Sequence, residues 1–137
     1  MPGGTMPRLT ISEAFARYGA TLKHVNWSVS AEAPDGSLVV SLWQHHFTKD
    51  PDGMLVCRDS FARWGGPGNI EFRDRVTAAL GGKQRVRLVT VHALDTAAIQ
   101  AGVDASTIKK DFGVREDLIG EVVAIDGDNC TICFTRV

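Results

Sequence analysis

Hydrophobic and polar residues alternate along residues 25–33, where every second position is apolar. Alternation with a period of two is typical of a β-strand with one buried face. A second strand is predicted over residues 37–47, after the turn-forming segment Pro34-Asp35-Gly36. Together these segments predict a β-hairpin near the amino end of the chain.

Further strands are predicted where short apolar runs lie between turn residues. A third strand follows the second after another turn, so the first half of the chain is predicted to form an antiparallel meander. Residues 85–93 are rich in Val and Leu, which is typical of a central strand. The other predicted strands cover residues 54–58, 118–125 and 130–137, the last two joined by a turn at 126–129.

Helical patterns lie between these strands and begin after residues that suit a helix N-cap. The helix predicted over residues 70–80 has one apolar face, which indicates packing against the sheet. Asn69 is predicted to cap this helix and Gly81-Gly82 to end it. The other predicted helices are one over residues 13–18, capped by Ser12, and two short ones that begin after Asp95 and Asp104.

Strands that come in hairpins, with helices between them, are typical of the α+β class. We predict a single domain over residues 9–137, in which an antiparallel sheet built from hairpins carries helices packed mainly on one face. The length of 137 residues fits one domain of ordinary size. Residues 1–8 are predicted to form a flexible tail.

The chain carries 15 Lys and Arg residues against 16 Asp and Glu residues, which gives a net charge of -1. This balance excludes a nucleic-acid-binding protein that acts through strong positive charge alone. The mean hydropathy is -0.04, and no apolar run approaches the roughly 20 residues that cross a bilayer, so we expect no membrane partner. The small, odd number of cysteines predicts reduced thiols and a cytoplasmic location.

The register of the first hairpin decides which side chains share a face. If the numbers of facing residues add up to about 70, as a turn with a glycine bulge predicts, Trp27 faces Trp43 on one side of the hairpin. His24 then faces His46 on the reverse side. Two interpretations of the tryptophans stay open: a core pair packed under a helix, or a stacking platform for bases or another planar ligand.

Residues 65–69 form a glycine-rich loop before a helix start, where backbone N–H groups can bind an anion. The flanking arginines favour a contact with phosphate; they are Arg58, Arg63, Arg73 and Arg75. A purely structural loop is the alternative interpretation, because the segment matches no nucleotide-binding motif.

Histidines and cysteines are the candidate metal ligands. A metal site would need His24 and His46 with a third ligand such as Asp59 or Cys57, whereas most histidines are surface or hydrogen-bonded groups. Cys130 and Cys133 match the pattern C-x-x-C, but a spacing of three in a strand sends the two thiols to opposite faces. We therefore predict no metal and no cofactor.

A set of short motifs is spread over most of the chain: Phe15 with Gly19, Asn26-Trp27-Ser28, Leu42-Trp43, Gly68-Asn69 and Asp126-Gly127-Asp128. Together they resemble an uncharacterised bacterial family of small proteins, over residues 12–134. Related modules of that family are sometimes joined to HNH-type nucleases and lie in mobile or defence-related gene neighbourhoods. This resemblance implies an accessory recognition role. It does not imply nuclease activity, because His45-His46 lacks the downstream Asn-His arrangement of an HNH nuclease.

Three hypotheses for function follow. The leading one is a non-enzymatic binding module that recognises nucleic acid. The alternative is a small-molecule-binding or oligomeric interaction protein, in which the tryptophans line an apolar pocket or a subunit interface. In the oligomeric version the strand at 130–137 could be a sheet edge that pairs across a homodimer. The third is a metal-dependent hydrolase built on His24, His46 and Asp59. The residues predicted to bind nucleic acid are Trp27, Trp43, His24, His46, Arg58, Arg63, Arg73 and Asn69.

Overall fold

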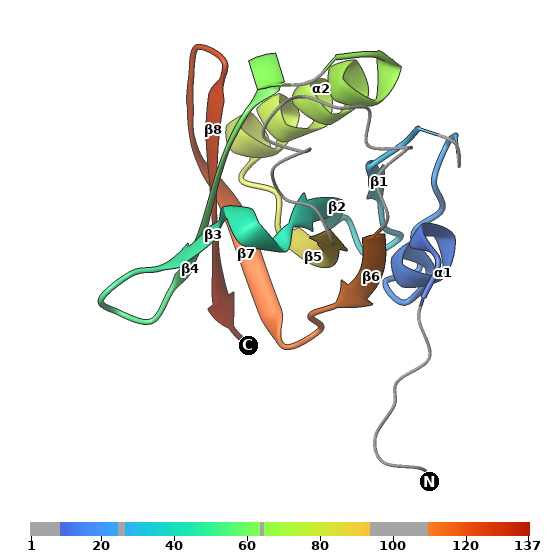
Figure 1. The fold of residues 1–137 in the computed structure, drawn as a ribbon, viewed down its shortest axis with the longest axis horizontal. Coiled ribbons are helices and arrows are strands. Elements are labelled where there is room, and N and C mark those ends of the chain that lie inside the picture. Colours follow the sequence, from blue (N-terminus) through green and yellow to red (C-terminus); the bar gives the residue numbers. More distant parts are fainter. Residues whose placement is uncertain (1–8, 25–26, 64, 94–109) are drawn as a thin grey trace, which may run out of the picture.

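The computed structural model describes residues 9–24, 27–63, 65–93 and 110–137. Within these residues the chain forms two α-helices, two short 3-10 helices and eight strands of one sheet (Figure 1). The helices are α1 (Ile11–Ala16), η1 (Gln44–His46), η2 (Phe61–Arg63) and α2 (Pro67–Gly82). The strands are β1 (Ser30–Glu32), β2 (Leu38–Trp43), β3 (Phe47–Lys49), β4 (Leu55–Ser60), β5 (Val86–Ala93), β6 (Lys110–Val114), β7 (Leu118–Asp126) and β8 (Asn129–Arg136). The tail predicted over residues 1–8 and the helices predicted after Asp95 and Asp104 lie outside the described residues.

The strands form one mostly antiparallel open sheet in the order β1-β2-β5-β7-β8-β4-β3, and β6 also pairs with β5. This confirms the prediction of helices combined with a mainly antiparallel sheet. β5 lies inside the sheet, as its run of Val and Leu predicts. β2 and β5 run parallel, with Leu38 opposite Val86, whereas the other described pairs are antiparallel.

The predicted meander in the first half of the chain is wrong. β1 and β2 do pair in the predicted register, with Ser30 opposite Val40. After β2, however, η1 leads the chain away, and β3 pairs with β4 at the opposite end of the sheet. The physical reason lies in β2 itself, where Leu38, Val39 and Val40 are all fully buried. Such a continuous apolar run is typical of a strand covered on both faces.

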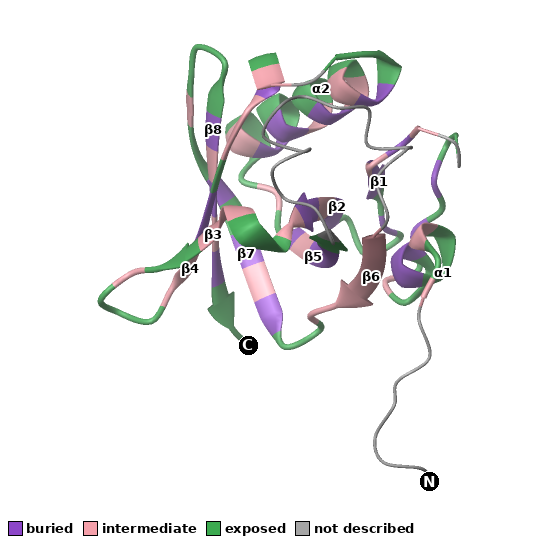
Figure 2. Ribbon diagram, viewed as in Figure 1, coloured by how far each residue is buried: buried purple, intermediate pink, exposed green. Residues whose placement is uncertain are grey.

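Helices lie on both faces of the sheet, so the predicted packing on mainly one face is not confirmed. Leu38 and Val40 belong to the same core as Phe72 of α2. Val39, between them, belongs to a second core with Phe15 of α1. Because successive residues of a strand point to opposite faces, α1 and α2 lie on opposite sides of β2. Figure 2 shows buried residues on both helices and along the strands.

Among the residues that the structure describes, β5 and β7 are joined by only one residue pair, Val86 with Gly120. β6 pairs with a later part of β5, where Val89 lies opposite Val114. Gly120 lies against the ring of Phe134, which is fully buried in the core under α2. The missing side chain at Gly120 therefore permits a close approach between β7 and β8 at this junction.

Helix α1 begins at Thr10 rather than at the predicted cap, Ser12. The Oγ1 atom of Thr10 accepts a hydrogen bond from the Glu13 N–H (3.1 Å), and the Glu13 carboxylate accepts one from the Thr10 N–H (3.0 Å). This reciprocal pair is a capping box, which satisfies two backbone donors at the helix start.

Helix α2 has Gly66 at its N-cap and Pro67 as its first residue. Proline suits this position because it lacks the N–H that would have no partner there. Asn69, the predicted cap, lies inside the first turn instead. Its side-chain amide donates a hydrogen bond to the carbonyl of Phe61 (2.8 Å), so it ties the helix to η2.

Lys83→Gly is expected to raise the free energy of unfolding by about 1 kcal/mol. Contrary to the prediction, α2 runs through Gly81-Gly82 and has Lys83 at its C-cap. Lys83 has a φ of 51°, in the left-handed region that favours glycine. Denaturant unfolding checks this, with Lys83→Ala as the control that removes the same charge and keeps the strain. An equal gain in both variants would contradict the prediction.

Candidate functional site

Trp27 and Trp43 do not form the predicted facing pair. β1 begins after Trp27, which lies in a turn where its N–H donates to the carbonyl of His24 (3.2 Å). The Oγ of Ser28 accepts a hydrogen bond from the His24 N–H (3.1 Å), a local bond that competes with strand pairing. The Trp27 ring stacks on His24, with centroids 4.2 Å apart, and the Trp43 ring lies 6.1 Å from His45. The two tryptophans therefore give no shared stacking platform.

The predicted group of His24, His46 and Asp59 does not form as a unit. His24 stacks on Trp27. His46 lies in η1 with His45, and only its Nδ1 atom comes near a member of the group, 3.5 Å from Oδ2 of Asp59. In the described ranges, no three His, Cys, Asp or Glu side chains gather as metal ligands. The geometry thus gives no support to the metal-dependent hydrolase.

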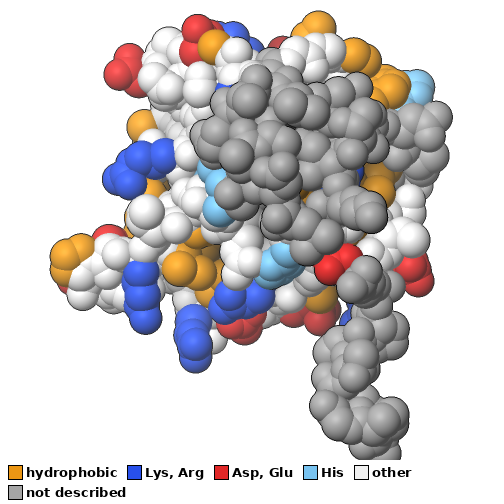
Figure 3. Space-filling view, viewed as in Figure 1, with side chains coloured by type: hydrophobic (Ala, Val, Ile, Leu, Met, Phe, Trp, Pro, Cys, Tyr) orange, Lys and Arg blue, Asp and Glu red, His pale blue; other side chains and the backbone are white. Residues whose placement is uncertain are grey.

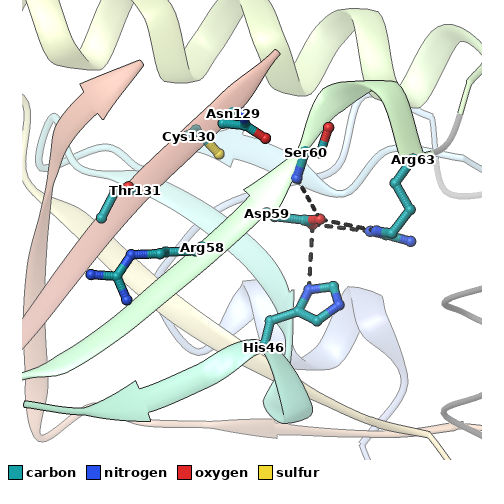
Figure 4. A pocket seen from close by; sticks show the side chains of 8 residues that line it. All are labelled: His46, Arg58, Asp59, Ser60, Arg63, Asn129, Cys130 and Thr131. Carbon is teal, nitrogen blue, oxygen red and sulfur yellow. Dashed lines mark hydrogen bonds and ion pairs between the residues drawn. The ribbon is translucent and has the colours of Figure 1, made fainter. Parts of the chain in front are cut away.

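A pocket of about 500 Å³ lies beside the end of β4 (Figure 4). β3 pairs with β4 only as far as Cys57, and beyond that point His46 of η1 and Arg63 of η2 stand beside the strand. β8 forms the other side, with Cys130 opposite Asp59. The lining residues are His46, Arg58, Asp59, Ser60, Arg63, Asn129, Cys130 and Thr131.

Asp59 connects the pocket residues through both carboxylate oxygens. Oδ1 accepts hydrogen bonds from Nε of Arg63 (2.9 Å) and from the Ser60 N–H (2.7 Å), and Oδ2 accepts one from Nη2 of Arg63 (2.9 Å). Burial opposes ionisation of Asp59, but the contacts with His46 and Arg63 outweigh it and hold the pKa of this carboxyl well below its ordinary value. Asp59 is therefore a charged carboxylate that orients Arg63 and His46.

Arg58 and Arg63 give the pocket more positive than negative charge. Arg63 donates hydrogen bonds to Asp59 through Nε and Nη2, two of the donors of its guanidinium. Arg58 is exposed on β4 and forms no ion pair with the residues that the structure describes. Asp59 is the single carboxylate of the lining. This excess of cations is local, because the whole chain has a net charge of -1.

The chemistry of the lining favours binding over covalent catalysis. Burial, together with the negative charge of Asp59, raises the pKa of the Cys130 thiol to about 11, so the thiolate nucleophile is scarce at neutral pH. The hydroxyl of Ser60 accepts a hydrogen bond from the Ala62 N–H (3.2 Å), so it satisfies a backbone donor at the start of η2. Hydroxyl and amide groups beside two guanidinium groups suit an anion with several oxygen atoms.

Three of the eight residues predicted to bind nucleic acid line the pocket: His46, Arg58 and Arg63. Arg73 lies outside this lining, where its guanidinium pairs with Asp128 (3.2 Å) and stands 5.0 Å from the centroid of the Phe61 ring. Asn69 donates a hydrogen bond to the carbonyl of Phe61, which gives it a structural role. The pocket, rather than the predicted tryptophan face, is thus the place where candidate binding residues meet.

Sequence reasoning missed the contribution of β8 to the pocket and the central place of Asp59. The spacing of four between Asp59 and Arg63 is a local signal, because such a spacing suits an ion pair across one helical turn. Asn129 and Thr131 reach the pocket only because β8 pairs with β4, and these strands are distant in the sequence.

No family model, curated protein or solved structure matches this chain. The resemblance to a bacterial family with modules joined to HNH-type nucleases therefore stays a prediction. Within the described part of the chain, no helix is long and apolar enough to cross a membrane. The fold and the pocket define a class: a domain of mixed α and β structure with an arginine-lined pocket beside its sheet.

Proposed function

We propose that this protein is a non-enzymatic binding module that recognises nucleic acid, and that its pocket holds a phosphate group. The observation that carries the proposal is that one pocket is lined by His46, Arg58 and Arg63, which come from η1, β4 and η2. Guanidinium groups bind phosphate oxygens through charge-assisted hydrogen bonds, often two at a time. We place the protein in the cytoplasm, where its three free cysteines stay reduced.

Asp59 supports this proposal because it orders the donors before a ligand arrives. Its carboxylate holds Arg63 through two hydrogen bonds and lies 3.5 Å from His46. An ordered guanidinium loses less conformational freedom on binding than a free one. Arg58 then supplies positive charge that Asp59 does not neutralise.

The alternative, a small-molecule-binding or oligomeric protein, has less support. An apolar cavity that holds both tryptophans would favour it, and neither Trp27 nor Trp43 lines the pocket beside β4. A homodimer that pairs through the strand at 130–137 would need β8 at a free edge of the sheet. That prediction is wrong, because β8 lies between β7 and β4.

Arg58→Ala is expected to weaken binding of a short single-stranded oligonucleotide by about tenfold, the loss of one charge-assisted contact. It should also lower the slope of log Kd against log salt concentration by about one, because one phosphate contact is lost. Fluorescence anisotropy at low salt measures both quantities, with a 5′-phosphorylated strand as DNA and as RNA.

Arg17→Ala is the matched control for this measurement. Arg17 is also an exposed arginine, but it lies at the end of α1 and outside the pocket lining. Both variants remove one positive charge from the chain, so an equal loss of affinity would indicate a general charge effect and contradict the pocket. No binding by the wild-type protein at high micromolar concentration would overturn the proposal.

A further inference from the structure

We infer that the pocket binds nucleic acid in a pH-dependent way: a proton taken up by His46, between about pH 8 and about pH 5.5, tightens the binding. The inference rests on the proposed function and names a form of regulation of the same pocket. It is carried by the position of His46 beside Asp59, by the contact of His46 with His45, and by the small excess of positive charge in the lining.

His46 lies at the wall of the pocket beside a mostly buried carboxylate. Its side chain is 9% exposed, and its Nδ1 atom lies 3.5 Å from Oδ2 of Asp59 (Figure 4). Burial acts to raise the pKa of Asp59, but His46 and Arg63 hold it well below its ordinary value, so this carboxylate stays charged while histidines titrate. Burial of the His46 ring disfavours a charge on it, whereas a negative charge at this distance favours the protonated form. His46 is therefore placed to hold a proton that the carboxylate stabilises.

His45 competes with His46 for the proton. The two rings meet edge to face with their centroids 4.3 Å apart, so two positive charges there would repel each other. Burial lowers the pKa of His45, the charges of His46 and Arg63 lower it further, and Asp59 acts in the opposite direction. Such a pair takes up its protons in two separate steps. We expect the first proton on His46, the ring beside the carboxylate.

One proton makes a large difference to the charge of the lining. Two arginines against one carboxylate give a net charge of +1, and a proton on His46 raises it to +2. Guanidinium groups do not titrate, and burial with the negative charge of Asp59 raises the pKa of the Cys130 thiol to about 11. Among the described residues of the lining, His46 is thus the group whose charge changes in this range. Each phosphate of a strand carries one negative charge, so the added positive charge strengthens binding at low salt.

Histidines outside the lining are the competing source of a pH effect. Figure 3 shows histidine side chains in more than one place on the visible face. His92 of β5 is exposed, and its Nε2 atom lies 3.2 Å from the hydroxyl of Thr90 on the same strand. Because β5 also lies against η1, His92→Gln is the matched control. It removes one titrating ring from an element next to the pocket but none from the lining.

Fluorescence anisotropy at constant low salt tests the inference with a labelled oligothymidylate strand. Thymine does not titrate in this range, and hydroxyl ends avoid a terminal phosphate, which titrates near pH 6. We expect wild-type binding to tighten by about tenfold from about pH 8 to about pH 5.5, the gain of one charge-assisted contact. His46→Gln should remove most of this gain, and His92→Gln should keep it.

An NMR titration of the imidazole ring protons identifies the protonated ring without any ligand. We expect the signals of His46 to shift between about pH 8 and about pH 5.5 and those of His45 to move much less. Spectra of His46→Gln and His45→Gln assign the two sets of signals.

The outcomes separate the inference from the proposed function. Binding that does not change with pH, an unchanged pH dependence in His46→Gln, or protonation of His45 first would each overturn the inference and leave the proposed function standing. Absence of binding by the wild-type protein at both ends of the range would overturn the proposed function and the inference with it.

Discussion

Gly120→Ala is expected to lower the free energy of unfolding by about 3 kcal/mol, at the upper end of the usual effects of overpacking. A Cβ atom at this position would lie 2.6 Å from Cε1 of Phe134 and 2.8 Å from the carbonyl oxygen of Cys133. Phe134 is fully buried and its ring packs near that of Phe47, so it has little room to move. A shift of β7 would instead disturb the residue pair that joins β7 to β5.

Gly81→Ala is the control for this substitution. Nothing lies within 4 Å of a Cβ atom built at Gly81, which is near the end of α2. Alanine in a helix is more stable than glycine, so this variant is expected to gain about 0.5 kcal/mol. Denaturant unfolding of both variants measures the contrast. Wild-type stability in Gly120→Ala would show that β7 and β8 separate freely at the junction, contrary to the packing described above.

The hairpins could be predicted from the sequence because their signals are local. Gly36 has a φ of 89° in the turn between β1 and β2, and the strands beside it pair in the predicted register. The hairpin of β7 and β8 likewise follows from its turn residues, and Gly127 has a φ of 59° there. A turn fixes the register of the strands next to it, but only as far as the strands extend.

The extent of the first hairpin could not be predicted in the same way. The alternation of residues 25–33 continues through Trp27, but the bond from the His24 N–H to the Ser28 side chain turns the chain before β1. The parallel pairing of β2 with β5 joins segments far apart in the sequence. Its local signal is the run Leu38-Val39-Val40, which indicates burial on both faces but names no partner strand.

The same distinction between local signals and contacts of distant segments applies to the candidate site. His46, Arg58 and Arg63 could be singled out as residue types that bind phosphate, and they do line the pocket. Their meeting depends on η1, which begins where the alternating pattern predicts a continuing strand. The site is thus assembled by a departure from the regular pattern, and that departure has no separate signal in the sequence.

Asp59→Asn is expected to lower the free energy of unfolding by about 2–3 kcal/mol near neutral pH, below the cost of breaking a fully buried ion pair. The substitution would leave the Arg63 guanidinium, whose side chain is 15% exposed, without its carboxylate partner. His46, 9% exposed, would lose the neighbouring negative charge. Removing one partner costs more than the pair contributes, because the remaining charge stays mostly buried.

The loss should depend on pH. Burial acts to raise the pKa of Asp59, but the hydrogen bonds and charge of His46 and Arg63 hold it below the ordinary 3.8. The folded state therefore binds this proton less tightly than the unfolded state, so Asp59 stabilises the fold above that ordinary value and loses this effect as the pH falls below it. The variant should differ from wild type less at about pH 3 than at about pH 7.

Asp117→Asn is the control for the stability measurement. Asp117 also accepts a hydrogen bond from an arginine, Arg115 (3.0 Å), but its side chain is 49% exposed. Exposed ion pairs contribute little, so this variant is expected to change the free energy of unfolding by less than about 1 kcal/mol. Wild-type stability in Asp59→Asn at neutral pH would show that Arg63 finds another partner, and would contradict the role given to Asp59.

The same substitution separates two roles that Asp59 can have in binding. If the carboxylate acted through its charge alone, its removal would make the pocket more positive and tighten the binding of phosphate. We expect a loss of about tenfold instead, because Arg63 and His46 lose the group that orients them. Anisotropy with the 5′-phosphorylated strand measures this at a temperature where the unfolding curve shows the variant folded. Tighter binding would show that charge outweighs orientation and would contradict the role given to Asp59.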